Sequence, residues 1–241
     1  MRHYLAAFIA SLALCGTAAA EPVFKENFDA AIYTEGAPLP TEVGLLSHGR
    51  WMPLGKGNYP GVVQVEDGSP CAALHVPRAE VKENAARIIG VFGRDGNDRT
   101  AVAEGIRLRL NFKCSALLNE TFFIQILGSD GKSRASVGMS ADGRITFSFG
   151  GKRQMPEIGF QPGRWYTLEL TMPPSPGTLS TYKAALYEKG AATPLVEKSG
   201  RVARSVEPGG EKYISFEAMH RVPGETLYVD DIEVETLSEQ H

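Results

Sequence analysis

Hydrophobic and polar side chains alternate along much of the chain with a period of two residues, which is the pattern of half-buried β-strands. The clearest example is residues 163–172, where Tyr166 and Leu168 would face one way and Trp165 and Glu169 the other. A strand with one apolar face needs a second layer to cover that face. We therefore expect this segment to be a central strand of a two-layered β-protein.

Residues 105–114 show the same pattern. Leucine and other apolar residues occupy every second position, and Arg107, Arg109 and Lys113 fall between them. The alternation predicts that the three cations line one outward face of a strand.

Shorter alternating segments fill most of the remaining chain, separated by Gly-, Pro- and Asp-Gly-rich turns. We predict further strands at 24–28, 62–66, 72–76, 87–92, 121–127, 133–139, 144–149, 181–188, 212–219 and 226–235. Residues 29–61 are predicted to be mainly loop and 77–86 a helical turn. Roughly a dozen short strands without long helices predict an all-β, single-domain β-sandwich.

The first 20 residues have the pattern of a secretory signal peptide: a basic start, an apolar stretch over 5–14 and a small-residue site before Glu21. The apolar stretch is shorter than the ~20 residues that a membrane-spanning helix needs. The segment before Cys15 also resembles a lipoprotein box, although Leu14 is large for that motif. We expect residues 1–20 to be removed, residues 21–241 to form the domain, and the protein to be secreted or periplasmic.

Charge narrows the range of partners. The chain has 28 acidic and 25 basic residues, a formal net charge of −3, and no basic run of the kind that binds nucleic acid. After the N-terminal segment no stretch is apolar enough for stable membrane insertion. The sequence therefore predicts neither a nucleic-acid partner nor a membrane-embedded protein.

Two cysteines follow the N-terminal segment, Cys71 and Cys114. An exported protein meets an oxidising compartment, where these two could form a disulfide. The alternative is two separate buried thiols. Metal-cluster spacing is absent from the sequence.

Four segments together resemble the concanavalin A-like jelly rolls, which include laminin-G-like modules, legume-type lectins and several glycanases. They are an opening strand at 24–29, Gly-Arg-Trp-Tyr at 163–166, the strand at 182–187 and a closing strand at 227–234. The resemblance implies a jelly-roll sandwich of two antiparallel sheets, with glycans met on the concave face or at the loop rim. Fold alone does not settle function.

The sequence can be compared with the catalytic motifs of two enzyme families that have this fold. Laminarinase-like glycosidases carry Glu-x-Asp-x-x-Glu on one strand, and this chain contains no Glu-x-Asp. Alginate-lyase jelly rolls use Arg-x-Glu, Gln-Ile-His and Tyr-x-Lys motifs, which here correspond to Arg78, Gln125 and Tyr182, with Leu127 in place of the histidine. The resemblance implies that Arg78 and Gln125 would neutralise a uronate carboxylate and Tyr182 would move the proton.

Several side chains are candidates for binding a ligand without catalysing a reaction. Trp51 and Tyr59 lie in the predicted loop, where exposed aromatic residues commonly make contacts. Trp165 would either stack on a sugar ring or pack under a neighbouring loop. Arg107 and Arg109 would either bind an anionic glycan or form a solvated face.

Asp230 and Asp231 are adjacent in the closing strand, so simple alternation predicts that their carboxylates point to opposite faces. The jelly-roll resemblance implies that one of them joins Glu26, near the first strand, in a structural Ca²⁺ site. The alternative is that one aspartate caps a turn or pairs with an arginine while the other is solvated.

The sequence thus predicts a secreted or periplasmic β-sandwich that binds a polysaccharide or oligosaccharide without catalysis. Two alternatives remain open: a polysaccharide lyase that acts on a uronate-containing glycan, and a surface or adhesion module that binds protein.

Overall fold

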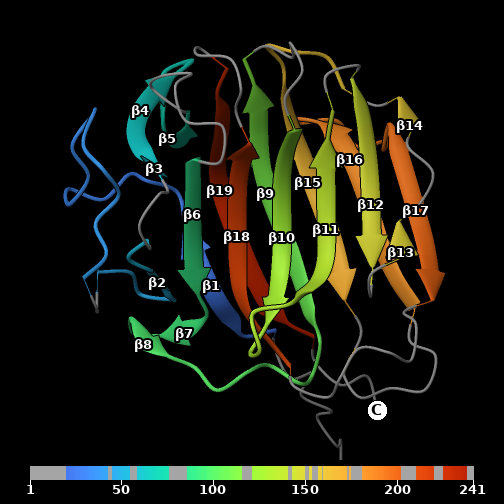
Figure 1. Ribbon diagram of the computed structural model, residues 1–241, viewed down its shortest axis with the longest axis horizontal. Coiled ribbons are helices and arrows are strands. Elements are labelled where there is room, and N and C mark those ends of the chain that lie inside the picture. The colour runs from blue at the N-terminus through green and yellow to red at the C-terminus, as the bar shows by residue number, and fades with distance from the viewer. Residues whose placement is uncertain are drawn as a thin grey trace, which may run out of the picture.

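The computed structural model describes the chain in thirteen stretches: 20–42, 45–54, 59–75, 86–115, 121–140, 143–149, 152–153, 157–158, 160–172, 174, 181–201, 210–219 and 225–237. Within them the protein is all-β, with nineteen strands in two large antiparallel sheets and one small ribbon. Figure 1 shows the two large sheets stacked face to face. The predicted all-β sandwich is confirmed.

The first sheet, called sheet A, has the strand order β17-β16-β15-β9-β19-β5-β4, and β1 pairs with β19. Its strands are β1 (Pro22–Glu26), β4 (Val62–Glu66), β5 (Ser69–Leu74), β9 (Ile106–Cys114), β15 (Trp165–Met172), β16 (Thr181–Glu188), β17 (Val196–Arg201) and β19 (Leu227–Thr236).

The second sheet, called sheet B, has the order β13-β12-β11-β10-β18-β6-β2, with β14 beside β12 and β3 parallel to β6. Its strands are β2 (Arg50–Trp51), β3 (Tyr59–Pro60), β6 (Ala86–Val91), β10 (Thr121–Gly128), β11 (Ser133–Met139), β12 (Arg144–Phe149), β13 (Lys152–Arg153), β14 (Glu157–Ile158) and β18 (Glu211–Met219). The small ribbon is β7 (Gly93–Arg94) with β8 (Asn97–Asp98).

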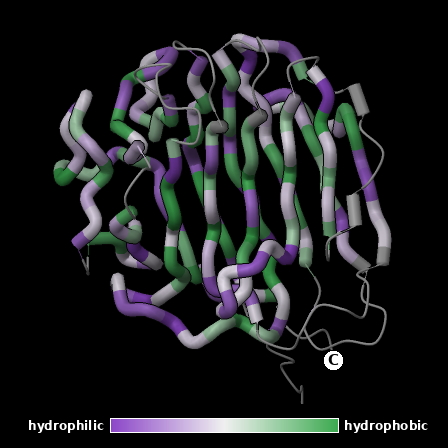
Figure 2. Tube along the Cα trace, viewed as in Figure 1, coloured by the Kyte–Doolittle hydropathy of each residue, from purple (hydrophilic) through white to green (hydrophobic). Residues whose placement is uncertain are grey.

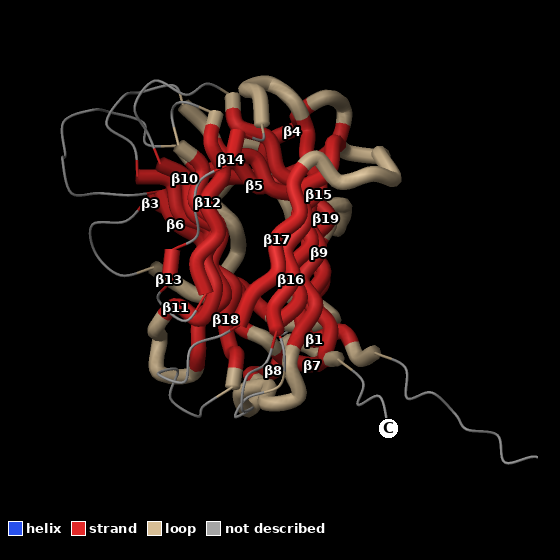
Figure 3. Tube along the Cα trace, turned by 90° about the vertical axis from the view of Figure 1, so that its right-hand side faces the viewer, coloured by secondary structure: helices blue, strands red, loops and turns tan. Residues whose placement is uncertain are grey.

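The core lies between the two sheets, where the apolar faces of the alternating strands meet. Leu110 on β9 is paired with Leu168 on β15, and both are fully buried. Ile124 and Ile126 on β10 cover them from sheet B and are 2% and 0% exposed. Green and purple segments alternate along the strands in Figure 2, and Figure 3 shows the two layers edge-on. The face assignment made from the alternation is therefore confirmed for these strands.

The closing strand β19 changes its neighbour halfway along its length. Its first part, from Leu227, pairs with β5, and its last part, from Ile232, pairs with β1. Pro22 of β1 lies opposite Glu235 of β19, so the first and the last described strands are neighbours in sheet A. Asp230 and Asp231 lie between these two pairings and belong to neither.

The β4–β5 hairpin closes with the predicted Asp-Gly turn. Asp67 and Gly68 have φ values of 51° and 83°, the two positive values that a two-residue hairpin turn of type I′ requires. The turn curls over the outer face of sheet A, where the Asp67 carboxylate accepts hydrogen bonds from Trp165 Nε1 at 2.9 Å and Lys113 Nζ at 2.7 Å. The β4–β5 turn therefore covers part of that face.

Some predicted boundaries differ from the structure. The segment predicted as loop between 29 and 61 contributes the two-residue strands β2 and β3, and β17 was not predicted because Val-Glu-Lys-Ser-Gly-Arg carries few apolar residues. The predicted helical turn at 77–86 lies outside the described residues except for its last residue, and the predicted signal peptide does so too except for residue 20. Among the described residues no helix is long and apolar enough to cross a membrane.

Of the two alternatives for the cysteines, the structure shows separate buried thiols, since Cys71 and Cys114 are both free and buried. Cys71 lies on β5 and Cys114 on β9, and β19 runs between these two strands. Two inter-strand steps amount to roughly 10 Å, which is more than a disulfide can span. Burial raises the pKa of the Cys71 thiol to about 12, so this thiol stays protonated.

Candidate functional site

The two aromatic residues predicted on an exposed loop are not exposed loop residues. Trp51 forms part of β2, is 2% exposed and stacks on Phe28 in the core, so its predicted position on an exposed loop is wrong, although it lines a hollow beside β6. Tyr59 begins β3 and is partly buried against the same core. Within the segment predicted as loop, β2 and β3 both pair with β6 and form an edge of sheet B.

Trp165 lies on the outer face of sheet A and is half-buried. Its indole donates to Asp67 of the β4–β5 turn, and Lys189 Nζ lies 5.1 Å from the ring centroid. The sequence left two interpretations of Trp165 open, stacking on a sugar ring or packing under a loop. The structure shows that Trp165 packs beneath a neighbouring turn. Part of the ring remains accessible beside Lys189.

The cations of β9 face outward as predicted, but they are not free charges. Arg107 forms an ion pair with Glu235, and Arg109 Nε lies 3.4 Å from Glu169 Oε1. Lys113 is 7% exposed, because the β4–β5 hairpin covers it and supplies Glu66 at 2.6 Å. An outward position on this sheet therefore does not mean exposure to solvent.

The prediction that Asp230 and Asp231 point to opposite faces is wrong. The register between β19 and β9 shifts between Asp230 and Glu233, which is a β-bulge, and Asp231 has a φ of 46°. The extra residue lets Val229 and Ile232 both enter the core while the two aspartates both lie toward the outer face of sheet A. Strict alternation does not hold across a bulge.

The three carboxylates proposed for calcium are each held by different donors, although Glu26 and Asp231 line the same groove. Glu26 is 5% exposed and accepts hydrogen bonds from Phe28 N–H at 2.7 Å and from the Tyr33 hydroxyl, and burial raises its pKa. Asp230 Oδ2 accepts from Ser69 Oγ at 3.1 Å, and burial raises the pKa of Asp230 as well.

Asp231 is engaged separately, by Asn111 Nδ2 at 2.7 Å. Among the described residues no three His, Cys, Asp or Glu side chains form a group that could hold a metal ion. A calcium ion shared by Glu26, Asp230 and Asp231 would have to displace these contacts.

The structure does not bring together the described members of the lyase set. Gln125 alternates with Ile124 and Ile126 on β10 and so faces outward from sheet B. Tyr182 is 1% exposed, lies on β16 of sheet A and stacks on Phe149 inside the core. Arg78 lies outside the described residues. Gln125 and Tyr182 cannot contact the same substrate in this arrangement.

Gln125 instead belongs to a row of residues that runs across the outer face of sheet B. The strand registers place Ser148, Ser136, Gln125, Ser215 and Ile89 directly opposite one another on β12, β11, β10, β18 and β6. Four inter-strand steps make this row roughly 19 Å long. Its first four members are uncharged side chains that can both donate and accept hydrogen bonds.

A second row runs beside the first, and on each strand its member lies two residues away from the member of the first row. It consists of Thr146, Gly138, Phe123, Glu217 and Arg87 in the same strand order. Phe123 is half-buried and lies over Gly138, where a Cβ atom would come within 3.2 Å of the ring. A glycine at this position leaves room for the aromatic ring to lie close to the sheet.

Hollows lie at both ends of the two rows. One, of about 280 Å³, is lined by Phe123, Ser136, Gly138, Thr146 and Ser148 together with Met139 and Ser140. The other, of about 330 Å³, lies beside β6 and has Arg87, Ile89, proline, leucine and methionine in its lining. The two rows and both hollows form one surface, which we call the sheet B strip.

The centre of the strip is held in place by Arg87. Its Nε donates to Ser215 Oγ at 3.1 Å, and Ser215, which is fully buried, lies opposite Gln125. Glu217 lies opposite both Arg87 and Phe123 and is half-buried. Among the described side chains of the two rows, Glu217 is the only carboxylate.

This arrangement suits a ligand with many hydroxyl groups. Hydroxyl and carboxamide side chains can exchange hydrogen bonds with such a ligand in either direction, and an aromatic ring provides an apolar surface for C–H groups. A two-carboxylate hydrolytic mechanism would need a second acid beside Glu217. Sequence reasoning found Gln125 but missed the rest of the strip, because the strip depends on which residues of distant strands lie opposite one another.

Comparisons with known proteins agree on the architecture. No family model matches the chain, and no curated protein matches it. Among solved structures the chain is similar to the CBM2 module of the evolved Dit protein of Lactobacillus casei BL23 phage J-1, with a TM-score of 0.58 and 13% identity over 92% of this chain and 98% of the module.

Two further solved structures show the same likeness. One, from a study of endo-acting O-glycanases of human gut bacteria, has a TM-score of 0.54 and 11% identity over 90% of this chain and all of that one. The other, an alginate lyase of polysaccharide lyase family 7, has a TM-score of 0.50 and 11% identity over 73% and 82%. Of the botulinum neurotoxin serotype D binding domain the chain spans about half, with a TM-score of 0.53 and 13% identity.

These likenesses, together with the two antiparallel sheets, show a concanavalin A-like jelly-roll fold, as the sequence predicted. At identities this low they show the fold alone. What the fold does in this protein has to be argued from its own surface.

Proposed function

We propose that this protein is an exported carbohydrate-binding module that holds a neutral glycan chain along the sheet B strip without catalysis. The observation that carries the proposal is the register of the strip: uncharged hydrogen-bonding side chains lie opposite one another on β12, β11 and β10, with Phe123 beside them and the buried Ser215 continuing the row on β18. An extended row favours an extended ligand that crosses the strands. The names of the phage module and the glycanase study support a glycan partner for this fold.

Charge favours a neutral glycan over a polyanion. In the two rows Arg87 is the only described cation, and Glu217 lies opposite it. A uronate- or sulfate-rich polymer would need several cations along its path. The export that we propose rests on the N-terminal pattern alone.

The test is a glycan array with the protein from which residues 1–20 have been removed, followed by calorimetric titration of the best glycan. We expect binding, and we expect Gln125→Ala and Phe123→Ala each to weaken it about tenfold, which corresponds to about 1.4 kcal/mol. The matched control is Lys183→Ala, which removes an exposed side chain from the outer face of sheet A. Failure to bind any glycan, or equal binding by all variants, would refute the proposal.

A polysaccharide lyase is the second candidate function, and one observation favours it. Arg87 and Gln125 both lie on the strip, Arg87 donates to Ser215, and Ser215 is the cross-strand neighbour of Gln125, so a uronate carboxylate could contact both. The check is absorbance of the unsaturated product with alginate and polyglucuronate as substrates. We expect no product, since the one described carboxylate of the two rows, Glu217, lies opposite Arg87, and no described histidine or tyrosine belongs to either row. Product formation that Arg87→Ala abolishes would establish the lyase instead.

A further inference from the structure

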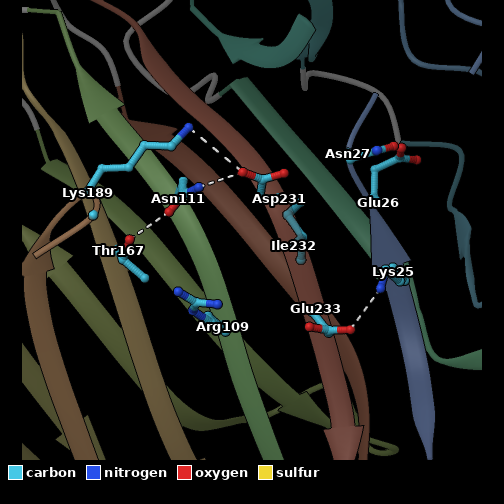
Figure 4. Close-up of a pocket in the computed structure, with 11 residues that line it drawn as sticks. Lys25, Glu26, Asn27, Arg109, Asn111, Thr167, Lys189, Asp231, Ile232 and Glu233 are labelled. Atoms are coloured by element: carbon cyan, nitrogen blue, oxygen red, sulfur yellow. Dashed lines mark hydrogen bonds and ion pairs between the residues drawn. The ribbon is translucent and has the colours of Figure 1, made fainter. Parts of the chain in front are cut away.

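The outer face of sheet A contains a groove of its own, with a volume of about 450 Å³. Figure 4 shows Asn111, Thr167 and Asp231 on its floor, Lys189 at one side and Lys25 at the other. The groove lies where β19 changes its neighbour from β5 to β1. It is on the opposite side of the sandwich from the sheet B strip.

Asp231 reaches this groove because of the β-bulge. Its φ of 46° is a left-handed conformation that a residue with a side chain adopts only at a cost in stability. Bulges commonly redirect a side chain next to a functional site. Here the bulge places the Asp231 carboxylate next to that of Asp230 on the outer face of β19, and the Asp231 side chain remains 53% exposed.

The floor of the groove is a fixed chain of hydrogen bonds. Thr167 Oγ1 donates to Asn111 Oδ1 at 2.7 Å, and Asn111 Nδ2 donates to Asp231 Oδ2 at 2.7 Å. Thr167 is 5% and Asn111 7% exposed, so surrounding atoms hold both side chains in place. The orientation of the Asp231 carboxylate is therefore set before any ligand arrives.

The rim, in contrast, consists of exposed and weakly held charges. Lys189 Nζ lies 3.8 Å from Asp231 Oδ2, and Lys25 Nζ lies 3.0 Å from Glu233 Oε1. Arg109 is paired with Glu169 at 3.4 Å. Exposed pairs of this kind contribute little to stability, so these side chains can turn toward a ligand at low cost.

The balance of charges defines the ligand. Because each cation of the rim lies beside a carboxylate, a polyanion would meet as much repulsion as attraction, and the polar floor offers nothing to a lipid. Asp231 can accept hydrogen bonds from hydroxyl groups, while Lys189 and Arg109 can donate to them.

We propose that this groove is a second ligand site that binds a short neutral saccharide, with Asp231 as the principal acceptor and Asn111 and Thr167 as positioning residues. The site does not depend on the sheet B strip. If both bind, the protein is bivalent and its two sites face opposite directions.

The test uses cellohexaose, laminarihexaose and mannohexaose as probes, with the stoichiometry measured by native mass spectrometry and calorimetry. In the double variant Gln125→Ala, Phe123→Ala we expect one site to remain. Adding Asp231→Gly should weaken that remaining site at least about tenfold. Glycine adopts the positive φ freely, so this substitution removes the carboxylate without disturbing the bulge.

Two further variants separate a ligand role from a purely structural one. Thr167→Val releases the Asn111 carboxamide and should weaken the same site, whereas Arg164→Ala, an exposed cation of sheet A paired with Glu188 outside the groove, should not. Residual binding that Asp231→Gly and Thr167→Val leave unchanged would overturn the inference. So would a wild-type stoichiometry of one that the sheet B substitutions abolish, a result that leaves the proposed function standing. Failure of every probe and of the glycan array would overturn both.

Discussion

The outer faces of the two sheets are built from the same alternating strands but carry different chemistry. On sheet A the outward positions hold cross-strand ion pairs such as Arg109–Glu169 and Lys25–Glu233. On sheet B the corresponding positions hold serines, threonine, glycine and Gln125 in registered rows. Paired charges keep an exposed sheet solvated, whereas the uncharged hydroxyl and amide side chains on β10, β11 and β12 can offer hydrogen bonds to a ligand. On β18 and β6 the rows continue with Ser215, which accepts from Arg87, and with Glu217. The difference is why we assign the extended ligand to sheet B.

The contrast between the two outer faces requires that the outward side chains of each strand are assigned correctly. Leu168 is fully buried and Arg109, on the neighbouring strand, is exposed. We expect Leu168→Ala to lower the free energy of unfolding by about 2–5 kcal/mol, because it leaves a cavity in the core. Arg109→Ala should cost less than about 1 kcal/mol, because its ion pair is exposed. Similar losses for both variants in a urea titration would show that the faces are assigned wrongly.

A second test concerns Glu211, the first residue of β18 in sheet B, which is 3% exposed. Burial raises its pKa from 4.5 to about 7, and Arg134 only partly offsets this effect. The unfolded chain loses the proton from about pH 4.5, but the folded protein keeps it until about pH 7. Stability should therefore fall as the pH rises through this window, by roughly 3 kcal/mol in all at about 1.4 kcal/mol per unit of pKa change.

Glu211→Gln should remove that dependence. We expect the variant to be more stable than the wild type at pH 8 and close to it at pH 4. The matched control is Glu217→Gln on the same strand, where the carboxylate is half-buried and we expect little change. A wild-type stability that stays level between pH 4.5 and 7 would mean that Glu211 is solvated in solution, and sheet B would then carry an ordinary surface charge.

The next expected effect is on the floor of the sheet A groove. Thr167→Val keeps the shape of the side chain but leaves the Asn111 carboxamide oxygen without its donor. A buried polar group that loses its partner costs about 1–3 kcal/mol. Thr171→Val, on the same face of β15 but half-exposed, should change the stability by less than about 0.5 kcal/mol. Equal melting temperatures for the two variants would show that the floor is not held by this hydrogen bond.

The sequence predicted well which side of each strand is buried, and predicted poorly which residues of distant strands lie opposite one another. Alternation fixes which side of a strand is buried, so the strands at 62–66, 133–139, 144–149 and 181–188 were predicted with the bounds that the structure has. It does not fix register between strands far apart in the chain, such as β10 with β18, and the sheet B strip depends on that register.

The errors have physical causes of the same kind. Trp51 was placed on a loop because glycine and proline surround it, yet stacking on Phe28 holds it in the core. The two aspartates of β19 were placed on opposite faces because a bulge cannot be read from alternation. Tertiary contacts decide both cases, and neither contact partner is close in sequence to the residue concerned.

The smallest expected effect is that of calcium. A calcium ion shared by Glu26, Asp230 and Asp231 would need carboxylate oxygens that converge, and in the structure each of these side chains is already engaged by different donors. We expect the melting temperature to be the same with added calcium and with chelator, because a ligand stabilises a protein only through preferential binding to the folded state. A rise in melting temperature that Asp231→Asn abolishes would contradict this expectation. It would mean that Asp231 exchanges its bond to Asn111 for the ion, and that the groove on sheet A is a metal site rather than a saccharide site.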